Sequence, residues 1–174
     1  FLHKLNIDIK KIFILNNWTL TSEISKIGLK KVKLSKAHNQ KFLFMGWLIK
    51  EKGIYDLLNA FIYLKDDFPS VKLFIAGHGK EYEKIKIFIK ENNLEDYCKL
   101  LGWVKGKKKL DLLETCDSLI LPSYSEGFPN SIIEALGSCL SVVSTSVGSI
   151  SSQLEQNTEF LLIPQKNSKL LYKK

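Results

Sequence analysis

The sequence predicts an α/β domain with a Rossmann-like, doubly wound parallel sheet. Short apolar runs of four to six residues alternate along the chain with segments in which apolar side chains recur every three to four positions. The apolar runs are nearly continuous, which is typical of strands that are buried on both faces. Because crossovers between parallel strands are right-handed, this order of elements gives a sheet with helices on both faces.

Seven segments have the composition of strands, and several end at a Gly or Pro. Gly46 closes the second segment, Gly77 follows the third and Pro122 follows the fifth. Gly and Pro are the residues that most often interrupt regular structure. The expected strands are residues 11–15, 42–46, 71–76, 98–101, 118–121, 141–145 and 160–163.

Four segments between these strands have helical periodicity. In the first, Ile54, Leu57, Leu58, Phe61 and Ile62 recur at the spacing of one helix face. The other expected helices are residues 82–89, 107–115 and about 130–138. Residues 16–40 are rich in Ser and Lys and only weakly periodic, which is typical of a linker.

The composition is that of an ordinary folded domain. The chain has 174 residues, of which 45% are hydrophobic and 25% are charged, close to the average of globular proteins. The longest apolar run, residues 42–49, is too short for the roughly 20 residues of a membrane helix. The three cysteines form no Cys-x-x-Cys pair, and no Cys/His cluster has zinc spacing. We therefore expect a cytoplasmic protein without a metal site.

Positive charge is concentrated in the first two thirds of the chain. All 26 basic residues are Lys, and 22 of them lie in residues 1–109, whereas residues 110–165 hold seven acidic residues and no Lys. The net charge of +8 suits nucleic acid or an anionic membrane. Because Arg makes most bidentate contacts to bases and phosphates, its absence predicts no nucleic-acid partner. Peripheral contact with the surface of a membrane stays an alternative. The run of Lys105, Lys107, Lys108 and Lys109 is interpreted as solvated.

Ligands of doubly wound sheets bind beyond the carboxyl ends of the strands. Residues 46–53, 77–80 and 122–130 occupy that edge. The third stretch leads into a helix, whose free N–H groups and dipole suit a phosphate. Glu126 precedes this helix and Glu134 lies about one turn inside it, and carboxylates accept hydrogen bonds from sugar hydroxyls. The alternative is a capping box, in which the Ser131 and Glu134 side chains only accept hydrogen bonds from backbone N–H groups at the start of the helix.

The other stretches at this edge carry weaker signals. Lys50 and Lys52 lie in a strand-to-helix loop, where an ammonium can neutralise a phosphate. The turn of Gly77, His78 and Gly79 lacks the third Gly of a dinucleotide fingerprint, and His78 is interpreted as an ordinary polar loop residue. The sequence has no P-loop, no nucleophile elbow and no Asp-x-Asp, the motif that commonly holds a divalent ion on a sugar-nucleotide diphosphate.

Five segments follow one another along the chain: FLFMGWLIKEKG (42–53), LFIAGHG (73–79), KLLGWV (99–104), DSLILPSYSEGFPNSIIEAL (117–136) and STSVGSI (144–150). In this order they resemble the C-terminal domain of GT-B fold glycosyltransferases of family 4, the group 1 type. Seven residues separate Glu126 from Glu134, which is the spacing of the family's E-x7-E motif. The resemblance covers about residues 40–165.

The resemblance implies a role for each matched residue. Lys52 would contact the donor diphosphate, and Glu126 would bind the transferred sugar, so both are the expected catalytic residues. Glu134 would hold the ribose hydroxyls. The remaining expected donor contacts are the backbone around Glu126 and a base-side loop: Gly127, Phe128, Pro129, Asn130, Gly102, Trp103 and Val104. The family transfers sugar with retention and requires neither a metal nor another cofactor.

Several positions depart from the family pattern. Trp47 occupies the place of an Arg that many members use as a second diphosphate cation, and Lys50 is a candidate to compensate for it. Cys139, Leu140 and Ser141 replace a Gly-Leu-Pro sequence. Ser151 and Ser152 replace a Pro-Glu pair. These changes favour an alternative function, a degenerate or partner-dependent module that binds a nucleotide-sugar without catalysis.

The resemblance also implies a division of the chain and a set of partners. Residues 1–40 would be a linker and an entry strand from a missing N-terminal domain, supplied in cis or in trans. Residues 41–165 would be the nucleotide-sugar-binding half of a GT-B enzyme, and residues 166–174 a truncated C-terminal tail. The expected reaction transfers sugar to a glycan or lipid-linked acceptor in surface polysaccharide or lipopolysaccharide biosynthesis, in the cytoplasm or at the inner face of the membrane.

Overall fold

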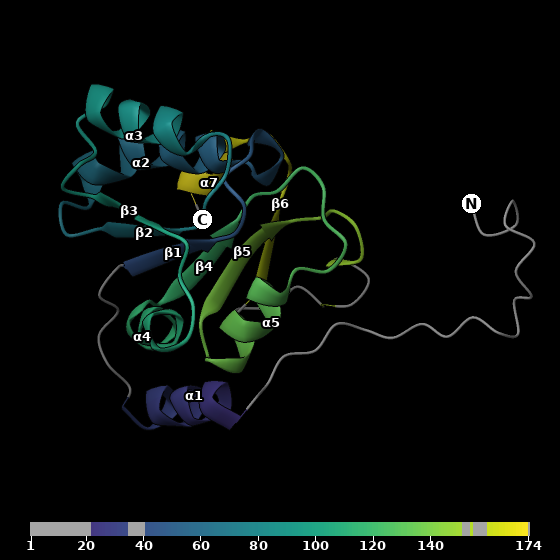
Figure 1. The fold of residues 1–174 in the computed structure, drawn as a ribbon. Coiled ribbons are helices and arrows are strands. Elements are labelled where there is room, and N and C mark those ends of the chain that lie inside the picture. Colours follow the sequence, from purple (N-terminus) through teal and green to yellow (C-terminus); the bar gives the residue numbers. More distant parts are fainter. Residues whose placement is uncertain (1–21, 35–40, 151–153, 155–159, 174) are drawn as a thin grey trace, which may run out of the picture.

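A computed structural model describes residues 22–34, 41–150, 154 and 160–173 (Figure 1). Their centre is a six-stranded parallel sheet with the strand order β3-β2-β1-β4-β5-β6. The strands are β1 (Lys41–Met45), β2 (Lys72–Ala76), β3 (Cys98–Gly102), β4 (Ser118–Leu121), β5 (Ser141–Thr145) and β6 (Phe160–Ile163). The direction of winding reverses between β1 and β4, and such a switch point is where doubly wound sheets bind ligands.

Helices cover both faces of the sheet (Figure 1). One face carries α2 (Ile54–Asp67), α3 (Tyr82–Glu91) and α7 (Ser168–Tyr172), and the other carries α1 (Ser22–Leu34), α4 (Lys107–Thr115) and α5 (Asn130–Gly137). A short 3-10 helix, η3 (Lys50–Lys52), precedes α2. The predicted fold class is therefore confirmed.

The core lies between the sheet and its two helix layers. Leu43 and Phe44 of β1 are fully buried, as are Leu73 and Ile75 of β2. Burial on both faces explains why these strands read as continuous apolar runs in the sequence. The six strands predicted from residue 42 onward are confirmed to within a residue or two. The four predicted helices are also present, and the first extends beyond its predicted apolar positions to Asp67. The strand expected at residues 11–15 lies outside the described residues.

The prediction of a linker over residues 16–40 is wrong for α1. Ile24 and Ile27 of this helix are only 4% and 8% exposed, and the helix packs against α4 and α5. Lys31 Nζ also donates a hydrogen bond to the carbonyl oxygen of Cys116, and burial lowers the pKa of Lys31. The apolar stripe is narrow and lysines flank it, so its periodicity was too weak to identify the helix.

The segment after residue 165 is also part of the folded body rather than a tail beyond it. The α7 helix packs on α2, with Leu171 buried and the Tyr172 hydroxyl donating to Asp67. The Asn167 side chain caps the helix by accepting a hydrogen bond of 2.9 Å from the Leu170 N–H. None of the helices that the structure describes is long and apolar enough to cross a lipid bilayer.

The packing of α1 makes a prediction for stability. Replacing Ile24 by Ala should lower the free energy of unfolding by at least about 2 kcal/mol, because it leaves a cavity against α4 and α5. Val32→Ala is the matched control, since Val32 lies on the same helix but is 70% exposed. Urea unfolding of both variants measures the difference. Equal stability of the two variants would show that α1 does not dock on the domain.

Candidate functional site at the carboxyl edge of the sheet

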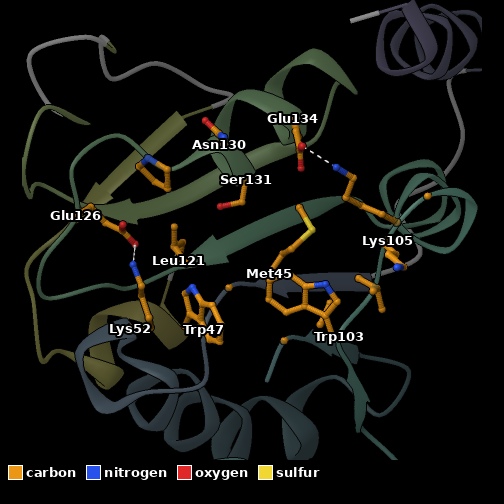
Figure 2. Close-up of a pocket in the computed structure, with 17 residues that line it drawn as sticks. Met45, Trp47, Lys52, Trp103, Lys105, Leu121, Glu126, Asn130, Ser131 and Glu134 are labelled. Carbon is orange, nitrogen blue, oxygen red and sulfur yellow. Dashed lines mark hydrogen bonds and ion pairs between the residues drawn. The ribbon is translucent and has the colours of Figure 1, made fainter. Parts of the chain in front are cut away.

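A cavity of about 540 Å³ opens at the carboxyl ends of β1 and β4 (Figure 2). Its walls come from the ends of β1, β2 and β4, from the segment after β3, from η3 and from the N-terminal parts of α4 and α5. The lining residues are Met45, Gly46, Trp47, Lys52, Ala76, Gly77, Trp103, Val104, Lys105, Gly106, Lys109, Leu121, Glu126, Pro129, Asn130, Ser131 and Glu134.

One end of the cavity holds an ion pair between Lys52 and Glu126 (Figure 2). The Lys52 Nζ and Glu126 Oε1 atoms are 2.6 Å apart, and both side chains are largely buried. The Ser123 hydroxyl donates to the same carboxylate oxygen at 2.8 Å. Breaking a buried pair by removing one partner leaves an uncompensated charge, so each partner holds the other in place.

The backbone brings Lys52 and Glu126 together through a contact that only glycine allows. Gly53, directly after Lys52, has a φ of 65°, and a Cβ there would lie 1.9 Å from the carbonyl oxygen of Pro122. The Tyr124 N–H donates to the Glu51 carbonyl at 2.7 Å. These contacts lock the loop after η3 against the loop after β4.

Side chains around Tyr124 add to this junction. The Tyr124 hydroxyl donates to Asp56 Oδ2 at 2.8 Å, and burial together with this hydrogen bond raises the pKa of Tyr124 to about 12. Thr145 and Ser144 of β5 donate through their hydroxyls to the carbonyl oxygens of Ser123 and Leu121. The loop that carries Glu126 is thus held by backbone and side-chain hydrogen bonds on two sides.

The N-terminus of α5 forms the wall beside Glu126. The helix begins at Asn130, and Pro129 occupies the N-cap without a side-chain cap hydrogen bond. Asn130 and Ser131 line the cavity, so their backbone N–H groups can serve an anion, whereas the Ile132 N–H donates to the Pro129 carbonyl oxygen. The alternative of a capping box is wrong, because Ser131 lies inside the helix rather than at its N-cap.

A second ion pair lies at the other end of the cavity. Lys109 Nζ is 2.7 Å from Glu134 Oε1, and Figure 2 shows this contact as a dashed line at Glu134. The two residues come from α4 and α5. Lys109 belongs to the lysine run at 105–109, which the sequence predicts to be solvated. That prediction is wrong for Lys109, whereas Lys107 and Lys108 are exposed.

Two indole rings form the wall opposite α5 (Figure 2). Trp47 follows β1 and Trp103 follows β3, and their ring centroids are 5.4 Å apart with an interplanar angle of 43°. Trp47 is 56% exposed and Trp103 is 60% exposed. Large exposed aromatic surfaces beside a polar cavity are typical of a place where a ligand covers them.

The structure brings most of the expected site residues together. Lys52, Trp103, Val104, Glu126, Pro129, Asn130 and Glu134 all line the cavity. Gly102, Gly127 and Phe128 do not: the Gly102 and Gly127 carbonyl oxygens accept hydrogen bonds from the Gly77 and Ser149 N–H groups, and Phe128 packs on the core. The donor contacts assigned to all of these residues, inside or outside the cavity, stay predictions.

The cavity also contains lysines that sequence reasoning missed. Lys105 and Lys109 line it, whereas Lys50, the candidate to compensate for Trp47, does not. Lys50 is exposed and lies near Glu81, whose pKa is lowered chiefly by the Tyr55 hydroxyl and to a lesser extent by neighbouring lysines including Lys50. His78 is exposed and contacts the Tyr82 ring instead of the cavity. The sequence offered one indication that Lys105 lines the cavity, which is its position directly after the base-side loop.

The arrangement combines three chemical functions in one space. Lys52 and the start of α5 suit an anion. Glu126 and Glu134 suit hydroxyl groups, and the two indoles suit a flat apolar ring. Within the described part of the chain, no group of three or more His, Cys, Asp or Glu side chains is placed to hold a metal ion.

Comparison with known proteins identifies a family. The family model for glycosyl transferases group 1 matches residues 26–174. A Campylobacter jejuni enzyme named N-acetylgalactosamine-N,N'-diacetylbacillosaminyl-diphospho-undecaprenol 4-alpha-N-acetylgalactosaminyltransferase is 32% identical over 154 residues, which cover 88% of this chain and 40% of that protein. The amylovoran biosynthesis glycosyltransferase AmsK of Erwinia amylovora is 27% identical over 160 residues, covering 85% of this chain and 39% of AmsK.

The fold is also similar to that of a solved structure. A mutant of S. aureus TarM, in complex with fondaparinux, alpha-GlcNAc-glycerol and UDP, aligns with a TM-score of 0.77 and 25% identity over 99% of this chain and 34% of TarM. The chain spans between 25% and 40% of the length of the curated relatives that it matches.

The contact between Gly53 and Pro122 makes a prediction for the site's framework. Gly53→Ala should lower the free energy of unfolding by at least about 2 kcal/mol, because a Cβ both strains the left-handed backbone and collides with the Pro122 carbonyl. Gly127→Ala is the control, since a Cβ there would meet no other atom of the described residues within 4 Å. Thermal and urea unfolding measure both. A Gly53→Ala variant as stable as the control would contradict the close approach.

Proposed function

The chain belongs to the group 1 glycosyltransferases, and we propose that its cavity binds the nucleotide-sugar donor of a sugar transfer reaction. The observation that carries the proposal is the order of groups across the cavity. Glu126 with Lys52 lies at one end, the start of α5 lies in the middle, and Glu134 lies towards the end that holds Trp103 and Lys105 (Figure 2). A sugar, a diphosphate, a ribose and a base follow one another in the same order along a nucleotide-sugar.

Each group of the donor then has a partner of suitable chemistry. Glu126 accepts hydrogen bonds from the transferred sugar, and Glu134 accepts them from the ribose hydroxyls. Lys52 and the N–H groups at the start of α5 bind the diphosphate. The base lies beside the loop of Gly102, Trp103 and Val104, where an indole face can stack on it.

The proposed reaction breaks the bond between the anomeric carbon and the diphosphate oxygen. Negative charge grows on the departing diphosphate, and Lys52 and the α5 N-terminus stabilise it. Positive charge grows at the anomeric centre, which the Glu126 carboxylate stabilises by analogy with glycoside chemistry. The acceptor hydroxyl forms the new bond on the same face and gives its proton to the departing diphosphate oxygen, so the configuration is retained. The proposal assigns no metal to this step, in keeping with the lack of an Asp-x-Asp sequence.

The names of the relatives support a class of acceptor. One is named for an undecaprenol-linked substrate and another for amylovoran biosynthesis. We therefore propose transfer to a glycan or lipid-linked acceptor in surface polysaccharide assembly, in the cytoplasm at the inner face of the membrane. Acceptor contacts come from a second domain, supplied in cis or in trans, because such sites lie in a cleft between domains.

A nucleotide-sugar-binding module without catalysis is the second candidate, and Trp47 is the observation that favours it. An indole at this position cannot neutralise a diphosphate. The two candidates differ in turnover: a transferase cleaves the donor once a matching N-terminal domain and an acceptor are added, whereas a binding module leaves the donor intact.

Thermal-shift binding of UDP, GDP and ADP tests the proposed function. A ligand present at 100 times its dissociation constant should stabilise the chain by about 2.7 kcal/mol. A shift with one nucleotide, lost in Glu134→Ala, is the expected result. A folded chain that responds to none of the three would contradict the proposal.

The role of Lys52 makes a sharper prediction. Lys52→Met should weaken binding of the nucleoside diphosphate by roughly 10- to 100-fold, the range for a lost hydrogen bond to a charged group, and should weaken binding of the nucleoside far less. Lys50→Met is the matched control, because it removes the same charge from the same turn outside the cavity. Isothermal titration measures all of these affinities. Equal losses in the two variants would show that only net charge matters.

A further inference from the structure

Three lysines begin α4, where a helix least favours positive charge. Lys107, Lys108 and Lys109 form its first turn, which contains no acidic residue. The positive end of the helix dipole makes each cation there unfavourable. Helix stability therefore does not account for Lys109, and its contacts must be considered instead.

Lys109 differs from its two neighbours in where its ammonium lies. Lys107 and Lys108 are exposed to water, whereas the Lys109 side chain is 29% exposed and reaches the 11% exposed Glu134 side chain. The 2.7 Å separation is that of a short, charge-assisted hydrogen bond. The pair joins α4 to α5 across the wall of the cavity.

A carboxylate as buried as Glu134 needs a partner to hold its charge and its direction. Burial of an ionised carboxylate without compensation is costly. Lys109 supplies an opposite charge to Glu134 Oε1. A carboxylate offers about four acceptor positions, so it can accept from an ammonium and from hydroxyl groups at the same time.

We infer that Lys109 is a positioning residue that holds the Glu134 carboxylate in place to accept the vicinal hydroxyls of a ribose, and so makes the site selective for ribonucleotides. The inference rests on the proposed function of the cavity. Lys109 acts through Glu134 rather than on the diphosphate. Removal of the Lys109 ammonium should therefore weaken the binding of ligands that carry ribose hydroxyls and leave the binding of ligands without them unchanged.

Binding of matched nucleotides tests this role. The probes are whichever of UDP, GDP and ADP binds the wild-type chain, and its 2′,3′-dideoxy counterpart, titrated into wild type, Lys109→Met, Lys109→Arg and Lys108→Met. We expect Lys109→Met to weaken ribonucleotide binding by about 10- to 100-fold and to leave dideoxynucleotide binding unchanged. Lys109→Arg should restore most of the ribonucleotide affinity, and Lys108→Met should match wild type.

The outcomes separate this inference from the proposed function. Equal loss of both ligands in Lys109→Met would show that Lys109 acts on the diphosphate, and unchanged binding of both would show that it has no role; either result overturns the inference while the proposed function stands. A wild-type chain that binds none of the three nucleotides overturns both. Should Lys109→Met fail to fold, Lys109→Gln takes its place in the same comparison.

Discussion

The site depends on the absence of one side chain, at Gly53. The backbone there passes so close to Pro122 that a Cβ would lie 1.9 Å from its carbonyl oxygen. This approach puts the loop after η3 directly against the loop after β4, and the hydrogen bond from Tyr124 to Glu51 continues the contact. Lys52 directly precedes Gly53, and Glu126 lies in the loop after β4. The backbone contact between the two loops therefore helps to bring this ion pair together.

The cavity is arranged as two carboxylates, each held by a lysine from another part of the chain. Glu126 and Glu134 flank the first turn of α5, while Lys52 and Lys109 reach them from η3 and α4. In the proposed donor complex, the diphosphate competes with Glu126 for the Lys52 ammonium group. Hydroxyl groups of the transferred sugar then compensate the Glu126 carboxylate, which would couple recognition of phosphate to recognition of sugar.

The sequence predicts the sheet and its edge well, because buried parallel strands leave a local pattern. Lys52, Glu126 and Glu134 were also found in advance, from their positions at the ends of strands and from the family motif. Lys109 was missed because a lysine in a lysine run has no local signature; tertiary packing brings it within 2.7 Å of Glu134. The α1 helix was missed for a similar reason. Ile24 and Ile27 form an apolar stripe that is too narrow to identify a helix from the sequence, and contacts of α1 with α4 and α5 bury it.

Titration of UDP, GDP or ADP into 15N-labelled protein, followed by two-dimensional NMR, shows whether the cavity at the carboxyl edge of the sheet binds a nucleoside diphosphate. We expect one nucleotide to shift the indole signals of Trp47 and Trp103 and the amide signals of Asn130, Ser131 and Glu134. Shifts confined to residues away from the cavity, such as α1 or α3, or no shift with any nucleotide, would contradict it.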